Sequence, residues 1–151
     1  MTAEAPRNVT DYLQDDHRRL DAILPDVKSS VAEGDFQRAG DRFAEFSRGL
    51  GRHIDIEEQI LFPFFEQTTG MVGGPTAVMR SEHVEIRRWM NDVTAALKAA
   101  DAAGVETSIR GLKDILSAHN MKEERILYPM TDRAAGNDSA REELVKRLQA
   151  F

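Results

Sequence analysis

The chain has 151 residues, of which 41% are hydrophobic and 30% charged, a balance typical of one soluble globular domain. It contains no cysteine, which excludes disulfides, thiolate zinc sites, iron–sulfur clusters and cysteine nucleophiles. The formal net charge of −6 argues against a nucleic-acid or anionic-membrane partner, and no apolar run approaches the ~20 residues of a membrane span.

Four long segments carry apolar residues at alternating spacings of three and four, the pattern of amphipathic helices packed in a bundle. We expect these helices at about Val9–Glu33, Phe36–Glu66, Pro75–Ala102 and Val105–Met130. The expected connections are Gly34-Asp35, Thr68–Gly74 and Ala103-Gly104. Short connections between long helices favour antiparallel neighbours. The predicted fold is therefore all-α, an up-down-up-down antiparallel four-helix bundle over about residues 9–130.

A shorter fifth helix is expected at about residues 139–150, where Ser139 and Glu142 have the spacing of a capping box. We expect its apolar side chains to cap one end of the bundle; they are Leu144, Val145, Leu148 and Phe151. Residues 1–151 are thus predicted to form a single domain.

Three prolines fall inside predicted helices. Pro25 predicts a kink in the first helix, because proline has no N–H to donate and its ring clashes with the preceding turn. Pro63 and Pro129 are expected to bend or end the second and fourth helices rather than to take part in chemistry.

The second half of the chain repeats the first 66 residues later, and all four histidines lie on this repeat (83 − 17 = 66 and 119 − 53 = 66). The same step relates two His-x-x-x-Glu segments. The repeated residues are His17, His53, Glu57, His83, His119 and Glu123. All six fall in the predicted apolar seams, which then continue at Ile60 and Phe64 and, in the repeat, at Ile126 and Met130. Such a duplicated set predicts one symmetric site.

The predicted topology brings these residues to one level of the bundle. Two residues of an antiparallel hairpin lie at the same height when the turn falls midway between them. The midpoints between successive histidines are residues 35, 68 and 101, all in or beside the predicted connections. Glu57 and Glu123 lie one helical turn beyond His53 and His119 on the same faces. The shared level lies well inside the four predicted helices rather than at their ends, which predicts that it is buried.

Burial makes a metal site the best interpretation of this set. A lone core histidine is more often hydrogen-bonded than metal-bound, and one acid four residues later is a weak motif. Two carboxylates in a dry core, however, cost several kcal/mol each unless they are paired or bind a cation. Buried His–Glu ion pairs without a metal are the alternative. Four imidazoles and two carboxylates match a pair of cations better.

The donor set favours iron. Structural zinc prefers four ligands, and calcium and magnesium prefer oxygen alone. Two histidines with shared carboxylates suit non-haem iron, with manganese second. If both glutamates and an oxo or hydroxo group bridge two iron ions, each ion keeps an open position. O2, peroxide or nitric oxide could bind there.

This array of four histidines and two glutamates resembles the hemerythrin-like, HHE cation-binding family over about residues 9–130. The resemblance implies a four-helix bundle with a carboxylate-bridged di-iron centre. The implied ligands are the six repeated residues, with His17 and His53 on one iron and His83 and His119 on the other. Ferritin-like di-iron proteins are excluded, because no histidine here has an acid three residues before it.

One departure from the family bears on function. Oxygen-carrying hemerythrins have a second histidine one turn after the third-helix ligand, where this chain has Arg87. The chain is therefore similar to the bacterial four-histidine branch linked to nitric oxide, peroxide or iron handling. Arg87 itself is expected in a surface ion pair, whereas Asn120 could bring a polar group near the gas pocket.

Several polar residues flank the predicted ligands. Asp16 and Glu82 precede two of the histidines and could orient an imidazole, but their position beside a seam favours a solvated flank. Glu58 and Glu124 are expected outside the core as well. The sequence gives the tyrosines, Tyr12 and Tyr128, less support than the six ligands, although the Tyr128 hydroxyl could donate a hydrogen bond at the metals.

Two functions remain open. The first is a di-iron enzyme that consumes peroxide or nitric oxide; the second is a non-catalytic sensor or store for O2, nitric oxide or iron. A metal-free helical interaction protein is disfavoured by the charges that face the core. The expected partner is a small diatomic or peroxide ligand, with no nucleic acid and no membrane, in a monomer or homodimer. Because Met1–Pro6 has no hydrophobic signal region, we expect a cytoplasmic protein.

Overall fold

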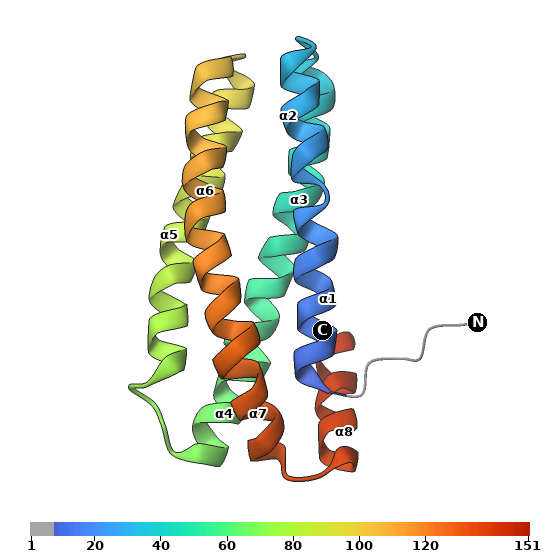
Figure 1. The fold of residues 1–151 in the computed structure, drawn as a ribbon, viewed down its shortest axis with the longest axis vertical. Coiled ribbons are helices and arrows are strands. Elements are labelled where there is room, and N and C mark those ends of the chain that lie inside the picture. The colour runs from blue at the N-terminus through green and yellow to red at the C-terminus, as the bar shows by residue number, and fades with distance from the viewer. Residues whose placement is uncertain (1–7) are drawn as a thin grey trace, which may run out of the picture.

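The protein is described here by a computed structural model of residues 8–151, in which all regular structure is helical (Figure 1). The elements are α1 (Val9–Asp21), α2 (Leu24–Ala32), α3 (Phe36–Ile56), η1 (Glu57–Leu61), α4 (Phe62–Thr69), α5 (Pro75–Lys98), α6 (Ala102–Lys122), η2 (Glu123–Leu127), α7 (Tyr128–Ala135) and α8 (Asp138–Gln149). The elements η1 and η2 are single π-helical turns inside longer helices. The long helices lie alongside one another as a bundle, α2 against α3 and α5 against α6. The all-helical prediction is confirmed.

None of the helices within residues 8–151 combines the length and the apolar character that crossing a bilayer requires.

The first predicted helix is divided at Pro25, as its sequence requires. Helix α1 ends at Asp21 and α2 begins at Leu24, so that Pro25 lies in the first turn of α2. A proline is tolerated there because its missing N–H would have no partner within the helix. Between the two helices the backbone N–H of Ile23 donates to the carbonyl of Leu20 at 3.0 Å. The predicted kink is confirmed.

The third connection differs from the prediction. Helix α5 ends at Lys98 and α6 begins at Ala102, so Gly104 lies inside a helix rather than in the loop. Asp101 is the reason, because its side chain accepts a hydrogen bond from the Gly104 backbone N–H at 3.0 Å and caps α6. The predicted Ala103-Gly104 loop was wrong because the capping aspartate outweighs the helix-breaking tendency of one glycine.

Helix α8 exists, but its start and its packing differ in detail from the prediction. Asn137 is the capping residue, and its Oδ1 accepts from the Ala140 backbone N–H at 2.8 Å, so the capping box at Ser139 and Glu142 is not used. Three of its predicted apolar contacts are buried: Leu144, Val145 and Leu148. Phe151, the fourth, is exposed.

The π turns are the main feature that helical periodicity failed to predict. In η1 the backbone N–H of Phe62 donates to the carbonyl of Glu57, and in η2 that of Tyr128 donates to Glu123. Each turn therefore begins at a predicted ligand and holds one residue more than an α-helical turn. The helices do not end at Pro63 or Pro129; each proline lies in the first turn of the α-helix that follows, where it needs no hydrogen-bond acceptor.

The extra residue shifts both seams by one position. The predicted Ile60 and Phe64 are replaced in the core by Leu61 and Phe65. The repeat shows the same shift: the predicted Ile126 and Met130 are replaced by Leu127 and Thr131. Of the four predicted positions, Ile126 is exposed and was wrong, whereas Ile60, Phe64 and Met130 are partly buried and pack against the apolar core. The shift arises because the strict 4,3 spacing assumes an uninterrupted α-helix.

The apolar core consists of two clusters with a polar layer between them. The first cluster joins α2 with α3, α5 and α6 and includes Leu24, Phe46, Ile86 and Leu112. The second cluster joins α1 with α4, α7 and α8 and includes Leu13, Phe62, Leu127 and Leu148. On α1, His17 lies between Leu13 of the second cluster and Leu20 of the first. The histidine level thus lies inside the bundle rather than at its end.

The one-residue shift can be tested with two adjacent leucine-sized side chains. Leu127 is 1% exposed and Ile126 is 50% exposed. We predict that Leu127→Ala lowers the free energy of unfolding of the metal-free protein by about 2–5 kcal/mol, because it leaves a cavity. Ile126→Ala should change it by less than about 0.5 kcal/mol. Urea unfolding of both variants measures the difference, and an uninterrupted α-helix would give the reverse order.

Candidate metal centre

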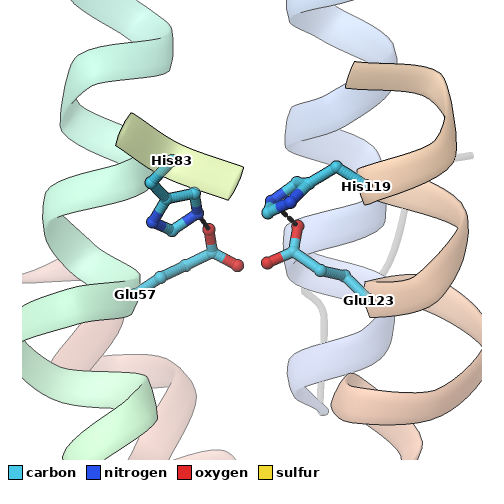
Figure 2. A group of neighbouring side chains, drawn as sticks. All are labelled: Glu57, His83, His119 and Glu123. Atoms are coloured by element: carbon cyan, nitrogen blue, oxygen red, sulfur yellow. Dashed lines mark ion pairs between the residues drawn. The ribbon is translucent and has the colours of Figure 1, made fainter. Parts of the chain in front are cut away.

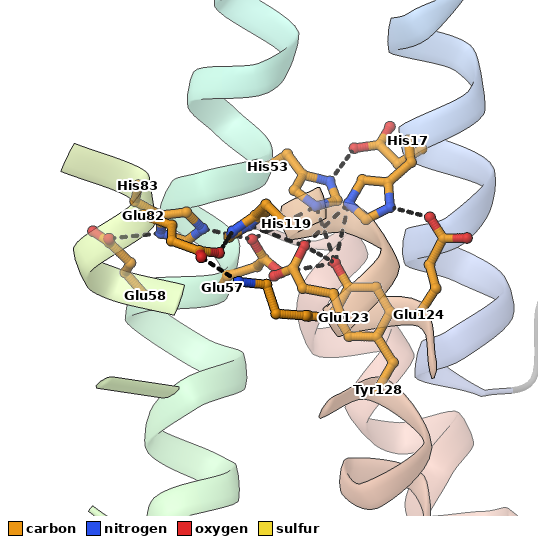
Figure 3. Close-up of polar contacts among 12 residues, drawn as sticks. His17, His53, Glu57, Glu58, Glu82, His83, His119, Glu123, Glu124 and Tyr128 are labelled. Carbon is orange, nitrogen blue, oxygen red and sulfur yellow. Dashed lines mark hydrogen bonds and ion pairs between the residues drawn. The ribbon is translucent and has the colours of Figure 1, made fainter. Parts of the chain in front are cut away.

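The four histidines come from four helices, α1, α3, α5 and α6, and meet in one buried layer (Figure 3). None is more than 3% exposed. They form two pairs: the ring centroids of His17 and His53 are 4.6 Å apart, and those of His83 and His119 are 4.9 Å apart. The predicted common level is therefore present in the structure.

The two glutamates face each other from opposite sides, Glu57 beside His83 and Glu123 beside His119, as Figure 2 shows. Both are completely buried. Glu57 Oε1 is 3.2 Å from His83 Nε2 and 3.7 Å from His53 Nε2. Each of these imidazoles belongs to a different pair, so the carboxylate contacts both halves of the layer.

Glu123 repeats this arrangement from the other side. Its Oε1 is 3.2 Å from His17 Nε2 and 3.2 Å from His119 Nε2. The structure thus brings all six predicted residues together, with each carboxylate placed between one imidazole of each pair. This is the arrangement that two neighbouring ions sharing two carboxylates would require.

Unpaired polar atoms show that the residues fit a cation. Among the described residues, three atoms of the six layer residues are buried without a hydrogen-bond partner: Glu57 Oε1, His83 Nε2 and Glu123 Oε2. A buried polar atom without a partner is strongly unfavourable. Within the described residues, two groups of donor atoms lie close enough to share an ion, one from Glu57, His83, His119 and Glu123 and one from His17, His53 and Glu123. Cations at these two places would satisfy the unpaired atoms.

The electrostatics of the carboxylate pair lead to the same conclusion. Burial raises the pKa of Glu57 well above its usual range, and the neighbouring Glu123 carboxylate raises it further. Two carboxylates this close cannot both be ionised in a dry core without a compensating charge. Burial also acts on Glu123, but contacts with Glu57 and His119 outweigh it and hold its pKa well below the usual range. Without a metal these opposite pKa shifts favour negative charge on Glu123 and disfavour it on Glu57, and a bound cation would favour the ionised form of both.

A second set of carboxylates surrounds the histidines and corrects the prediction of solvated flanks. Each histidine Nδ1 is hydrogen-bonded to an acid from a neighbouring helix. The pairs are His17 with Glu124 at 2.8 Å, His53 with Asp16 at 2.8 Å, His83 with Glu58 at 2.9 Å, and His119 with Glu82 at 3.0 Å. The four contacts run from α1 to α3, from η1 to α5, from α5 to α6, and from η2 back to α1, so they form a closed ring around the bundle.

This acid ring sets the orientation of every imidazole. When Nδ1–H donates to a carboxylate, the lone pair of Nε2 is free and points into the layer, where a metal would take it. Burial alone would raise the pKa of Asp16, but its hydrogen bond with His53 lowers it to about 2, so Asp16 stays ionised. Arg19 at Asp16 and Lys122 at Glu82 add cations outside the ring. The acids are therefore positioning residues for the four histidines.

Tyr128 is a functional candidate that the sequence supports only weakly. It is completely buried, and its hydroxyl oxygen lies 2.8 Å from Glu57 Oε2 and 3.0 Å from Glu123 Oε1. In an uninterrupted α-helix, Tyr128 would point about 140° away from Glu123, since five residues span about 500°. The π turn η2 returns it to the face of Glu123. Tyr12, by contrast, packs against the second apolar cluster.

Two further predicted residues lie at the edge of the site. Arg87 forms an ion pair with Asp55 at 2.9 Å, with both side chains partly exposed, which confirms the surface ion pair. Asn120 is buried, its Oδ1 has no partner, and it lines a surface cleft with Asp21 and Glu124. Asn120 thus faces this cleft, and its position near a gas pocket stays a prediction.

Comparison with known proteins places this site in a family context. The family described as "Hemerythrin HHE cation binding domain" matches residues 8–131. A "DNA nickase" from Nostoc sp. is 25% identical over 80% of this chain. An "Iron-sulfur cluster repair protein YtfE" is 37% identical in Escherichia coli O81 and 36% in Escherichia fergusonii, over 53% of this chain. The chain spans 32% of the Nostoc protein and 40% of the Escherichia proteins. No solved structure matches.

The acid ring predicts a measurable effect on metal affinity. Glu124→Gln removes the charge that holds the His17 imidazole, and we expect the affinity for metal to fall by about 10- to 100-fold. Glu85→Gln, at an exposed glutamate of α5 that pairs only with Arg88, is the matched control and should bind metal like the wild type. Competition with a chelator measures both affinities. Equal affinities in the two variants would show that the ring does not position the histidines.

Proposed function

The chain belongs to the hemerythrin HHE cation-binding family, and from this premise we propose that its polar layer holds two non-haem iron ions. His17 and His53 would bind one ion, His83 and His119 the other, and Glu57 and Glu123 both. The observation that carries this proposal is the placement of each carboxylate between one imidazole of each pair. The unpaired buried atoms of this layer support it.

The donor set supports iron over other metals, with manganese as the alternative. The chain has no thiolate, and the layer offers four imidazoles, which disfavours calcium and magnesium. It offers more than the four ligands of a structural zinc site. Two histidines with shared carboxylates for each ion is a set suited to non-haem iron.

The substrate that we propose is a small oxygen or nitrogen species: peroxide, O2 or nitric oxide. When bound, a pair of redox-active iron ions supplies electron transfer to or from such a molecule. The protein chain restricts access to the layer and fixes the orientation of the side chains in it. The ligands are almost completely buried between two apolar clusters, which excludes larger substrates and bulk water. The acid ring fixes the imidazoles, and the Tyr128 hydroxyl can hold a proton beside both carboxylates.

We propose redox turnover rather than storage, with a non-catalytic sensor or store as the alternative. Two relatives are named for iron–sulfur cluster repair, which is consistent with iron chemistry in this family. We do not carry DNA nicking over from the Nostoc protein, because this chain covers only a third of it and has a net charge of −6. The activities of the longer relatives otherwise bear on this chain only as proposals.

We further propose an up-down-up-down order of four long helices, formed by α1–α2, α3–α4, α5 and α6–α7, in a single domain with α8. The pairing of α2 with α3 and of α5 with α6 supports this order, since a short connection joins each pair. A cytoplasmic location and a monomeric or homodimeric state complete the proposal.

Metal analysis of ligand variants tests the function. Protein expressed with iron and purified without chelator should hold about two irons per chain by mass spectrometry. Glu57→Ala or Glu123→Ala should lower this content well below two, because each removes a carboxylate shared by both halves. Glu142→Ala, at an exposed residue of α8, is the control and should keep the wild-type content.

The outcomes separate the possible functions. Zinc alone, or no metal after an attempted iron reconstitution, would contradict the redox function. If iron is bound, catalytic gas evolution from peroxide or consumption of nitric oxide supports turnover. A stable oxygenated or nitrosylated spectrum without turnover would support the sensor or store instead.

A further inference from the structure

At one pair of repeat positions whose rings stack on proposed ligand histidines, the internal repeat places an apolar residue in one half and a polar residue in the other. Phe62 and Tyr128 are equivalent by the 66-residue step, both directly follow a π turn, and both are completely buried. The Phe62 ring stacks on His83 with centroids 5.6 Å apart, and the Tyr128 ring stacks on His17 at 5.8 Å. The two residues thus face opposite halves of the layer and differ by a single hydroxyl.

That hydroxyl lies among the donor atoms of the His17–His53 half. Its oxygen is 3.3 Å from His17 Nε2 and 3.2 Å from His53 Nε2, in addition to its two close carboxylate contacts. Two donor atoms that bind the same ion at an angle of 90°, each about 2.1 Å from it, lie about 3.0 Å from each other. The phenol oxygen therefore has the spacing of a neighbouring ligand to all four donors. Phenol oxygens are known ligands of iron in proteins.

The donor counts of the two halves then differ. If Glu57 and Glu123 bind both ions, each ion has two imidazoles and two carboxylate oxygens. The Tyr128 hydroxyl would add a further donor to the His17–His53 half alone.

The other half has no polar group at the equivalent place. His83 Nε2 and Glu57 Oε1, which lie 3.2 Å apart, have no hydrogen-bond partner, and Phe62 offers them only the face of a ring. The ion that these two atoms would hold therefore keeps a position without a protein ligand on the side of Phe62, where a small molecule could bind.

Resting on the proposed di-iron centre, we propose that the two metal positions are unequal. Tyr128 is a seventh protein ligand, on the ion held by His17 and His53, and the small molecule binds to the ion held by His83 and His119. On ligation the phenol gives up its proton to the medium, as protein ligands commonly do when they bind a metal. Which of the two ions binds the small molecule is thus decided by the hydroxyl that Tyr128 has and Phe62 lacks.

The spectrum of the ferric protein tests the ligand. A phenolate bound to ferric iron gives a charge-transfer band in the visible region, with ring modes in the resonance Raman spectrum. We expect this band in the wild type and its loss in Tyr128→Phe, with the iron content of the variant still at about two per chain. Tyr12→Phe removes the other tyrosine of the chain, which lies in the second cluster, and should keep the band.

An iron-loaded wild type without the band, or an iron-loaded Tyr128→Phe that retains it, would overturn the proposal and leave Tyr128 as a hydrogen-bond donor. If the wild type takes up no iron, the proposed function itself fails, and metal analysis shows this independently of the spectrum.

Azide titration of the same proteins tests the open side. The wild type should bind about one azide per chain, and Tyr128→Phe about two, because both halves then have an open position. Phe62→Tyr adds a hydroxyl to the His83–His119 half and should weaken azide binding by at least about tenfold. Two azides on the wild type, or unchanged binding by Phe62→Tyr, would contradict the assignment. If Phe62→Tyr does not fold, the azide count of Tyr128→Phe decides alone.

Discussion

The structure depends on one constraint: two carboxylates and four imidazoles share a layer of the bundle from which water is excluded. Glu57 and Glu123 are completely buried, and apolar clusters close the layer on both sides. Such a layer is stable only if its charges are compensated. The donor atoms that remain unpaired point to cations as the compensation. Metal binding and folding are therefore expected to be coupled in this protein.

The other features of the site serve this layer. The acid ring orients each imidazole from outside, so that its Nδ1 is occupied and its Nε2 faces inward. The π turns begin at the two glutamates and bring the residue five positions later back toward the site. Those residues are Phe62 and Tyr128. A nearly symmetric scaffold thus carries one asymmetric hydroxyl.

The sequence predicted which six residues meet in the layer because they lie on an exact internal repeat at helical spacing, and it predicted the helices because their seams are regular. It could not predict the acid ring. A residue next to a seam, such as Asp16, points about 100° away from it, and the rotation of the helix decides whether it meets solvent or a neighbouring helix. Tyr128 could not be placed at the site from the sequence, because the extra residue in η2 turns the following side chains toward a different face of the helix. Loop boundaries are limited in the same way. Gly104 suggested a loop, but the hydrogen bond from its N–H to the Asp101 side chain places it inside α6.

The central claim is that the polar layer is a two-metal centre, and anomalous diffraction from crystals of the iron-loaded protein tests it most directly. Data collected on either side of the iron absorption edge locate iron atoms without assumptions about the ligands. The account predicts two separate peaks inside the layer, one beside His17 and His53 and one beside His83 and His119, with Glu57 and Glu123 between them. A single peak, or none in crystals of protein that contains iron, would contradict it and leave the layer as a network of buried ion pairs.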